Sequence, residues 1–172
     1  MQTMSYTYGK WYNTRMRRCK ETKIKAPEAL LNLLNQRRLP LSEEGEEKTL
    51  HELGFLLSAY QGYVAAVHLP ASIRNDMEVS PEEIEMIDLL EGEDEKYLPV
   101  FTDSQAMDEA PFDVRENSIL FYCDVLDLHS LLTRSHADAI VLNPGQDDLF
   151  LSEQLLENMI RMDPKNNPHQ YS

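Results

Sequence analysis

The segment from Lys96 to Met162 constrains the fold more than any other part of this 172-residue chain. Three short apolar runs lie in it, at Tyr97–Phe101, Ile119–Cys123 and Ala139–Leu142. Continuous apolar runs of this length are typical of strands that are buried on both faces. Each run is followed by polar residues that favour turns and helix N-caps. The resulting order of strand, short helix, strand, helix, strand, turn and helix predicts a compact core of α and β elements.

Further elements are predicted before this segment. The spacing of leucines predicts helices over Pro27–Arg38 and Thr49–Tyr60, and the apolar run Tyr63–Leu69 predicts a strand. Ser80 as an N-cap, followed by proline and two glutamates, predicts an acidic helix over Pro81–Glu91. We therefore expect an α+β fold, in which a small mixed β-sheet of four to five strands is flanked by helices and preceded by an N-terminal basic helical arm.

Charge is distributed unevenly along the chain. Residues 1–38 carry nine lysines and arginines and two acids, a net charge of +7, whereas the remaining 134 residues carry seven bases and 28 acids, a net charge of −21. A linker is predicted over Leu39–Lys48, where proline, glycine and four glutamates occur together. The predicted domains are accordingly a basic arm and helix with an acidic linker at 1–46, and an α+β domain with a short C-terminal tail at 47–172.

The cysteines and the hydropathy pattern limit the class of protein. Cys19 and Cys123 lie far apart and neither belongs to a CxxC pair, so we expect no disulfide framework and no zinc site. No window approaches the ~20 apolar residues of a membrane span, and no apolar signal region is found at the N-terminus. Phosphate-binding glycine motifs are absent. We expect a cytoplasmic protein that uses no cofactor and does not associate with a membrane.

A family resemblance rests on the same segment. The order Leu98–Asp103, an apolar strand, a helix, Ile140–Pro144, then Leu151-Ser152-Glu153 and a closing helix resembles the N-terminal domain of the SseB family, the enhanced serine sensitivity proteins of bacteria. We expect the match to cover Thr49 to Met162. The resemblance implies an α+β domain in a cytoplasmic protein without established catalytic residues.

One candidate site lies at the ends of the three later strands. Asp103, Asp124 and Asn143 each follow one of these strands, and parallel strands would bring them to one edge of the sheet. With their neighbours, the predicted groove consists of Thr102, Asp103, Cys123, Asp124, Asn143 and Gln146. The alternative is that Asp103 caps a helix, Asp124 begins a turn, and Asn143-Pro144-Gly145 is an ordinary turn. We favour the alternative.

Cysteine and histidine give two weaker candidates. Cys123 at a strand end has the position of a nucleophile, but the carboxylates of Asp124 and Asp127 would raise the pKa of its thiol, so a buried structural cysteine is the better interpretation. His129 and His136 could share a metal ion with Asp127 only if a helix ended between them. We expect no metal site, because no established ligand spacing is present.

The basic arm is the segment that we expect to contact a partner. Its candidate residues are Lys10, Trp11, Arg15, Arg17, Arg18, Lys20, Lys23 and Lys25. Cations beside aromatic rings suit single-stranded nucleic acid, but the acidic remainder of the chain would repel phosphates, so docking onto an acidic protein surface or self-association is favoured.

The function that follows is a non-enzymatic, cytoplasmic protein-interaction or regulatory module of the SseB type. In it the arm and the helix Pro81–Glu91 are the charged faces, and Tyr97–Asp103 with Leu142–Gln146 form a groove at the sheet edge. Two alternatives stay open. One is a small-molecule binder or enzyme that acts at the strand ends, and the other is a nucleic-acid accessory protein that uses the basic arm.

Overall fold

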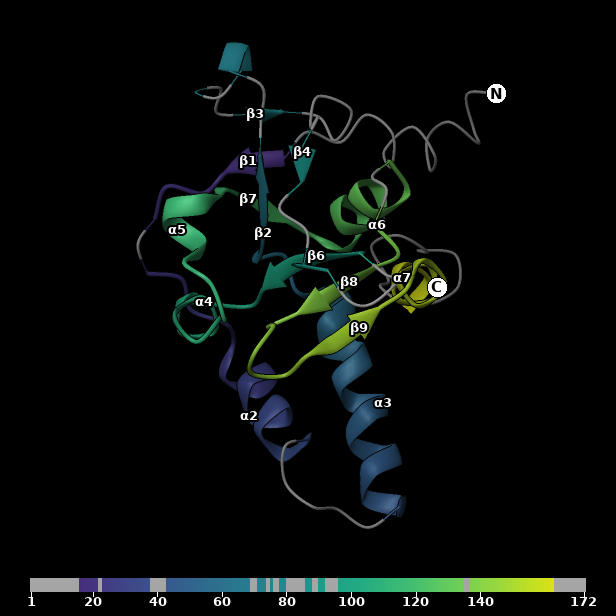
Figure 1. Ribbon diagram of the computed structural model, residues 1–172. Coiled ribbons are helices and arrows are strands. Elements are labelled where there is room, and N and C mark those ends of the chain that lie inside the picture. The colour runs from purple at the N-terminus through teal and green to yellow at the C-terminus, as the bar shows by residue number, and fades with distance from the viewer. Residues whose placement is uncertain are drawn as a thin grey trace, which may run out of the picture.

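A mixed β-sheet with helices packed on it forms the framework of the protein in the computed structural model (Figure 1). The structure describes residues 16–21, 23–37, 43–68, 71–73, 75, 78–79, 86–87, 90–91, 96–134 and 137–162. The strands are β1 (Met16–Arg18), β2 (Tyr63–His68), β3 (Glu78–Val79), β4 (Met86–Ile87), β5 (Leu90–Glu91), β6 (Lys96–Phe101), β7 (Ile119–Cys123), β8 (Ala139–Leu142) and β9 (Leu149–Leu151). The helices are α2 (Glu28–Arg37), α3 (Glu43–Ala59), α4 (Ser104–Asp108), α5 (Val114–Asn117), α6 (Val125–Arg134) and α7 (Glu153–Met162), with a 3₁₀ turn at Ala71–Ile73.

Seven strands follow one path through the sheet, in the order β3-β1-β7-β2-β6-β8-β9, while β4 pairs with β2 and β5 pairs with β6. β2 is antiparallel to both β6 and β7, and β6 is parallel to β8. Strands β6, β7 and β8 therefore run in the same direction. The prediction of four to five strands was too low, because β1, β3 and β9 have only two or three residues each and such short strands show no alternating pattern.

Strand β2 has an apolar core on each of its two faces. Tyr63, Ala65 and Val67 point into the larger core, which helices α2, α3, α6 and α7 cover. Val64 and Ala66 point into a smaller core, which α4, α5 and the segment after β1 complete. A strand that is buried on both faces reads as a continuous apolar run, which is why the sequence predicted this strand correctly.

The beginning of the described chain belongs to the main body of the fold. β1 pairs with β3 and β7, and α2 packs against α3. Met16, Leu30 and Leu34 are at most 1% exposed and lie in the larger core with β2. The division at residue 46 stays a prediction, but β1 and α2 pack in the same core as the elements after that boundary.

Two predicted elements are wrong where the structure describes them. Met86–Ile87 and Leu90–Glu91, within the predicted helix Pro81–Glu91, are strands, and the rest of that predicted helix lies outside the described residues. They pair with β2 and β6, so backbone hydrogen bonding to the sheet outweighs the local helix signals. The linker predicted over Leu39–Lys48 is helical from Glu43 onward, because α3 begins there, and its residues before Glu43 lie outside the described ranges.

The remaining core elements agree with the sequence. The predicted helices at Pro27–Arg38 and Thr49–Tyr60 correspond to α2 and α3, and the later strands and helices occur in the expected order. Within the ranges that the structure describes, no helix is both long enough and apolar enough to cross a membrane.

We predict that Met16→Ala lowers the free energy of unfolding by about 2–4 kcal/mol, because the side chain is fully buried and its removal leaves a cavity. The exposed neighbour Arg17 provides the control, since Arg17→Ala should change stability by no more than about 0.5 kcal/mol. Urea unfolding followed by circular dichroism measures both. If Met16→Ala were as stable as the wild type, β1 would contribute little to the core and would belong to a separable arm.

Candidate functional site

The common direction of β6, β7 and β8 brings their C-terminal ends to one edge of the sheet, as the strand-end hypothesis required. The three strand ends are not all neighbours along that edge, however. Asp103 and Asn143 follow the neighbouring strands β6 and β8, whereas β2 separates Asp124 from both. The edge therefore brings two of the three predicted polar groups together and leaves the third apart.

A buried hydrogen-bond network joins the ends of β6 and β8. Asn143 Oδ1 accepts the Thr102 backbone N–H at 2.9 Å. Asn143 Nδ2 donates to Thr102 Oγ1 at 3.0 Å and to Asp147 Oδ2 at 2.7 Å. All three side chains are buried. Each polar atom of the Asn143 side chain therefore has a protein partner, as a stable buried polar network requires.

The turn that contains Asn143 is held by its own backbone. The Asn143 carbonyl accepts N–H bonds from Gln146, Asp147 and Asp148. Asn143 has a φ of 52°, a left-handed conformation that asparagine tolerates better than most residues. Gly145 has a φ of 87°, and a Cβ there would lie 3.0 Å from the carbonyl oxygen of Glu109. The predicted turn is present.

Asp103 is the N-cap of α4, since its Oδ1 accepts the backbone N–H of Ala106 at 2.8 Å. Beside it, the Tyr60 hydroxyl donates to the carbonyl oxygen of Thr102 at 2.6 Å. Burial, together with the Asp103 carboxylate, raises the pKa of Tyr60 to about 12. The hydroxyl therefore keeps its proton at neutral pH and acts as a hydrogen-bond donor at the end of β6.

Asp124 has a similar structural role at the start of α6. Its Oδ1 accepts the backbone N–H of Asp127 at 2.9 Å, and Asp127 Oδ2 accepts the backbone N–H of Asp124 at 2.9 Å. This reciprocal arrangement satisfies backbone donors at a helix N-terminus in the manner of a capping box. Asp103 and Asn143 thus have the roles of cap and turn residue that the favoured alternative assigned to them, whereas Asp124 caps a helix and does not begin a turn.

Cys123 is buried in the larger core, where its Sγ lies 3.7 Å from Met16 Sδ. Burial raises the pKa of the thiol well above its ordinary value, and the carboxylates of Asp127 and Asp124 raise it further, against a smaller opposing effect of a backbone hydrogen bond from Ala65. Reactive cysteines need the thiolate form, so this environment supports a structural cysteine.

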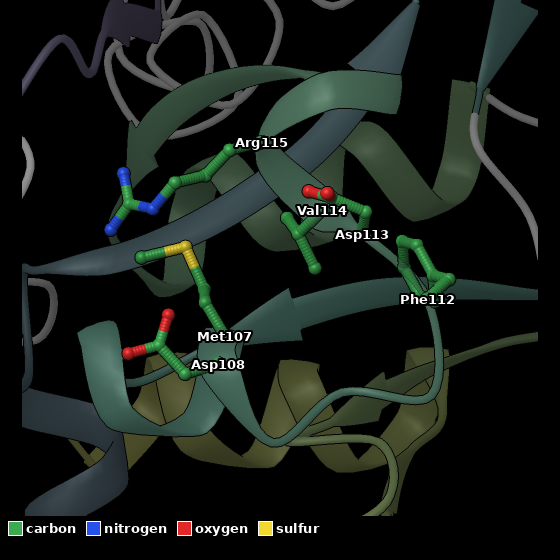
Figure 2. Close-up of a pocket in the computed structure, with 6 residues that line it drawn as sticks. All are labelled: Met107, Asp108, Phe112, Asp113, Val114 and Arg115. Carbon is green, nitrogen blue, oxygen red and sulfur yellow. The ribbon is translucent and has the colours of Figure 1, made fainter.

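The structure also contains a hollow that the sequence analysis did not predict. It has a volume of about 300 Å³ and is lined by Met107, Asp108, Phe112, Asp113, Val114 and Arg115. Figure 2 shows Met107 and Asp108 on α4, with Arg115 across from them on α5. Its volume is at the lower end for ligand pockets, and its residues come from a helix–loop–helix segment without a recognisable motif.

The predicted contact arm is only partly within the described residues. Lys10, Trp11 and Arg15 lie outside them, whereas Arg17, Lys20, Lys23 and Lys25 are exposed and Arg18 is half-buried. Backbone hydrogen bonds fix this segment to the fold: Cys19 N–H donates to the carbonyl of Leu120 at 2.8 Å, and Ser104 N–H donates to that of Ile24 at 3.0 Å.

One further cluster was missed. His129 on α6 lies beside Glu153 and Glu157 on α7, with one possible ligand atom from each within 4.8 Å of the others. The neighbours that the sequence suggests for His129 are Asp127 and His136 instead. Asp127 caps α6, and His136 lies outside the described residues. These side chains meet because α6 packs against α7, and no local spacing in the sequence predicts that contact.

A mixed sheet with helices on both faces, and helix caps at the ends of β6 and β7, defines a mixed α/β domain. Its sequence matches the SseB protein N-terminal domain over residues 20–158, and the chain belongs to that family. The match begins well before Thr49, where it was expected to start, in agreement with the packing of α2 in the core.

A more distant likeness is to the phenylalanine–tRNA ligase beta subunit of Chlamydia caviae, which is 27% identical over 133 residues. The alignment covers 72% of this chain but only 16% of that protein, so the chain spans a small part of the relative. No solved structure matches the chain.

We predict that Asn143→Ala lowers the free energy of unfolding by about 2–4 kcal/mol, because it leaves buried groups of Thr102 and Asp147 without their partner and removes asparagine from a left-handed position. Gln146→Ala, in the same turn, should cost no more than about 0.5 kcal/mol. Urea unfolding compares the two. If the two variants were equally stable, the hydrogen bonds of the Asn143 side chain would not be needed for folding, and the side chain would be available to bind a ligand.

We predict that Cys123 reacts very slowly with a colorimetric disulfide reagent in the folded protein. A Cys19→Ser variant leaves Cys123 as the reporting thiol. Because burial and nearby carboxylates disfavour the thiolate, the rate at pH 8 should be at least about 100-fold lower in the native state than in urea. Similar rates in the two states would instead support a nucleophilic role for this residue.

Proposed function

We propose that this SseB-domain protein is a non-enzymatic cytoplasmic module that binds a protein partner through an exposed basic surface. The basic surface consists of Arg17, Lys20, Lys23, Lys25 and Arg115. Arg115 belongs to it because its Nη1 donates to the carbonyl oxygen of Glu21 at 3.4 Å. The observation that carries the proposal is that these exposed cations lie beside backbone that is hydrogen-bonded to β7 and α4.

The fixed backbone favours specific binding. The backbone next to Lys20 is hydrogen-bonded to Leu120 through Cys19, and the backbone next to Lys23 and Lys25 is hydrogen-bonded to Ser104 through Ile24. Preorganisation reduces the entropy cost of association. Among the residues that the structure describes, no ion pair engages Arg17, Lys20, Lys23 or Lys25, and an incoming carboxylate would find these charges available.

The composition of the surrounding surface favours a protein over a polyphosphate. Asp108 and Asp113 lie in the hollow beside Arg115, and Glu116 is exposed next to it. Phosphate groups would be repelled by these carboxylates, whereas a protein surface can present both signs of charge at matching positions. The acidic composition of the rest of the chain adds to this repulsion.

The non-enzymatic part of the proposal rests on how the strand-end groups are used. Asp103 and Asp124 accept backbone hydrogen bonds at helix starts, Asn143 bonds to Thr102 and Asp147, and Cys123 is buried with a raised pKa. Groups held in this way are poorly suited to proton transfer or nucleophilic attack. The small-molecule alternative keeps the hollow between α4 and α5 as its best location.

Nucleic-acid binding is a second candidate because the chain resembles part of a protein named as a tRNA ligase subunit. The same basic surface would supply the phosphate contacts. This candidate predicts that nucleic-acid binding falls steeply as the salt concentration is raised. It also predicts that charge reversal weakens the affinity for all nucleic-acid sequences about equally.

The proposal predicts that the wild type retains a partner protein from cell extract. The triple variant Lys20→Glu/Lys23→Glu/Lys25→Glu should retain at least about tenfold less of that protein. A matched control, Lys48→Glu/Lys96→Glu/Arg161→Glu, changes the net charge equally at exposed positions elsewhere and should retain it. Quantitative mass spectrometry of the captured proteins measures the difference. Salt of about 1 M, where charges are screened beyond about 3 Å, should release the partner from the wild type.

Two controls separate the alternatives. Nuclease treatment before capture should leave the retained protein unchanged, and a gel-shift titration with tRNA should show no binding that depends on Lys20, Lys23 and Lys25. Retention of the same proteins by both triple variants would contradict the proposal. Retention that nuclease abolishes would favour the nucleic-acid candidate.

A further inference from the structure

A histidine and two glutamates meet between α6 and α7, away from the basic surface. One possible ligand atom from each of His129, Glu153 and Glu157 lies within 4.8 Å of the other two. His129 lies on α6, more than twenty residues before the two glutamates on α7, and the packing of α6 against α7 brings them together. We propose that they form a binding site for a divalent transition-metal ion, with zinc as the best-fitting ion, which joins the two helices.

The first two ligands already contact each other directly, through a long hydrogen bond, at a distance that also suits a shared ion. His129 Nε2 lies 3.4 Å from Glu157 Oε1. A charge-assisted hydrogen bond between nitrogen and a carboxylate is shorter, about 2.7–2.9 Å. Two ligands that each bind zinc at about 2.0–2.1 Å in tetrahedral geometry lie about 3.3–3.4 Å apart. The separation of this pair matches that spacing, whereas the full set, within 4.8 Å, would have to contract around an ion.

The positions of the two glutamates complete a three-ligand set. Glu153 and Glu157 are four residues apart on α7, so they lie on the same side of the helix. Glu153 is exposed in the first turn, and rotation about its side-chain bonds can bring its carboxylate closer. Two like charges at this spacing repel each other. A bound dication would cancel that repulsion as well as use both carboxylates.

The rigidity of the histidine supports the assignment. His129 is 6% exposed on a helix whose neighbours Leu128 and Leu131 are fully or almost fully buried in the larger core. Leu156 and Met159 anchor α7 in the same core. The first ligand is therefore held in place, and an ion would need only the partly exposed carboxylates to adjust. Nitrogen with two carboxylate oxygens suits zinc, with a water molecule in the fourth position.

Such an ion would stabilise the folded state, because the ligand set exists only when α6 and α7 are packed together. The inference is independent of the proposed partner-binding function. It uses other residues and is tested by other measurements.

The test is metal binding to the tag-free, chelator-treated full chain. Zinc titrated against a chromogenic chelator should show one ion bound per chain, and cobalt should give the intense visible absorption of a tetrahedral site. Glu157→Gln and Glu153→Gln/Glu157→Gln should weaken zinc binding by at least about tenfold and abolish the cobalt signal. Zinc should raise the melting temperature of the wild type and leave that of the double variant unchanged.

Matched controls keep the result interpretable. His51→Gln and Glu116→Gln change exposed residues of the same types and should bind zinc as the wild type does. The glutamine variants preserve side-chain size, and metal-free melting curves check that they fold. Absence of a one-to-one zinc complex in the wild type would overturn the proposal, as would equal zinc affinity of the wild type and the double variant.

Discussion

Burial of β2 on both faces is the constraint on which the rest of this structure depends. All five residues from Tyr63 to Val67 are fully buried, with alternate side chains in two cores. A single layer of helices cannot cover both faces, so α4, α5 and the segment after β1 must close the second one. That requirement fixes the backbone of the basic segment to the sheet. The same constraint therefore determines the fold and positions the surface to which we assign binding.

The sequence predicted the long elements well because their patterns were strong. Helices at α2 and α3 and the strands β2, β6, β7 and β8 were all found at their places. The short strands were missed, and the helix at Pro81–Glu91 was wrong where β4 and β5 lie. Two-residue strands exist only because a neighbouring strand offers hydrogen-bond partners, and that information is not local.

The candidate site shows the same division between local and non-local information. The roles of Asp103 as a cap and of Asn143 in a turn follow from neighbouring residues, so they could be predicted. The placement of β2 between Asp124 and Asp103 could not, because it depends on strand order. His129 and Glu157 meet only through the packing of two helices, and the spacing of histidines along the chain pointed to other partners.

The strand order has a consequence for how the chain acquires its structure. The sheet partners of β2 lie at Met86–Ile87, Lys96–Phe101 and Ile119–Cys123, all later in the chain. β1 likewise pairs with β7, about a hundred residues downstream. During synthesis on the ribosome, the strand that is buried on both faces can complete its pairing only after residue 123 has emerged. Such non-local pairing folds slowly, and a nascent chain with this topology would benefit from chaperone protection.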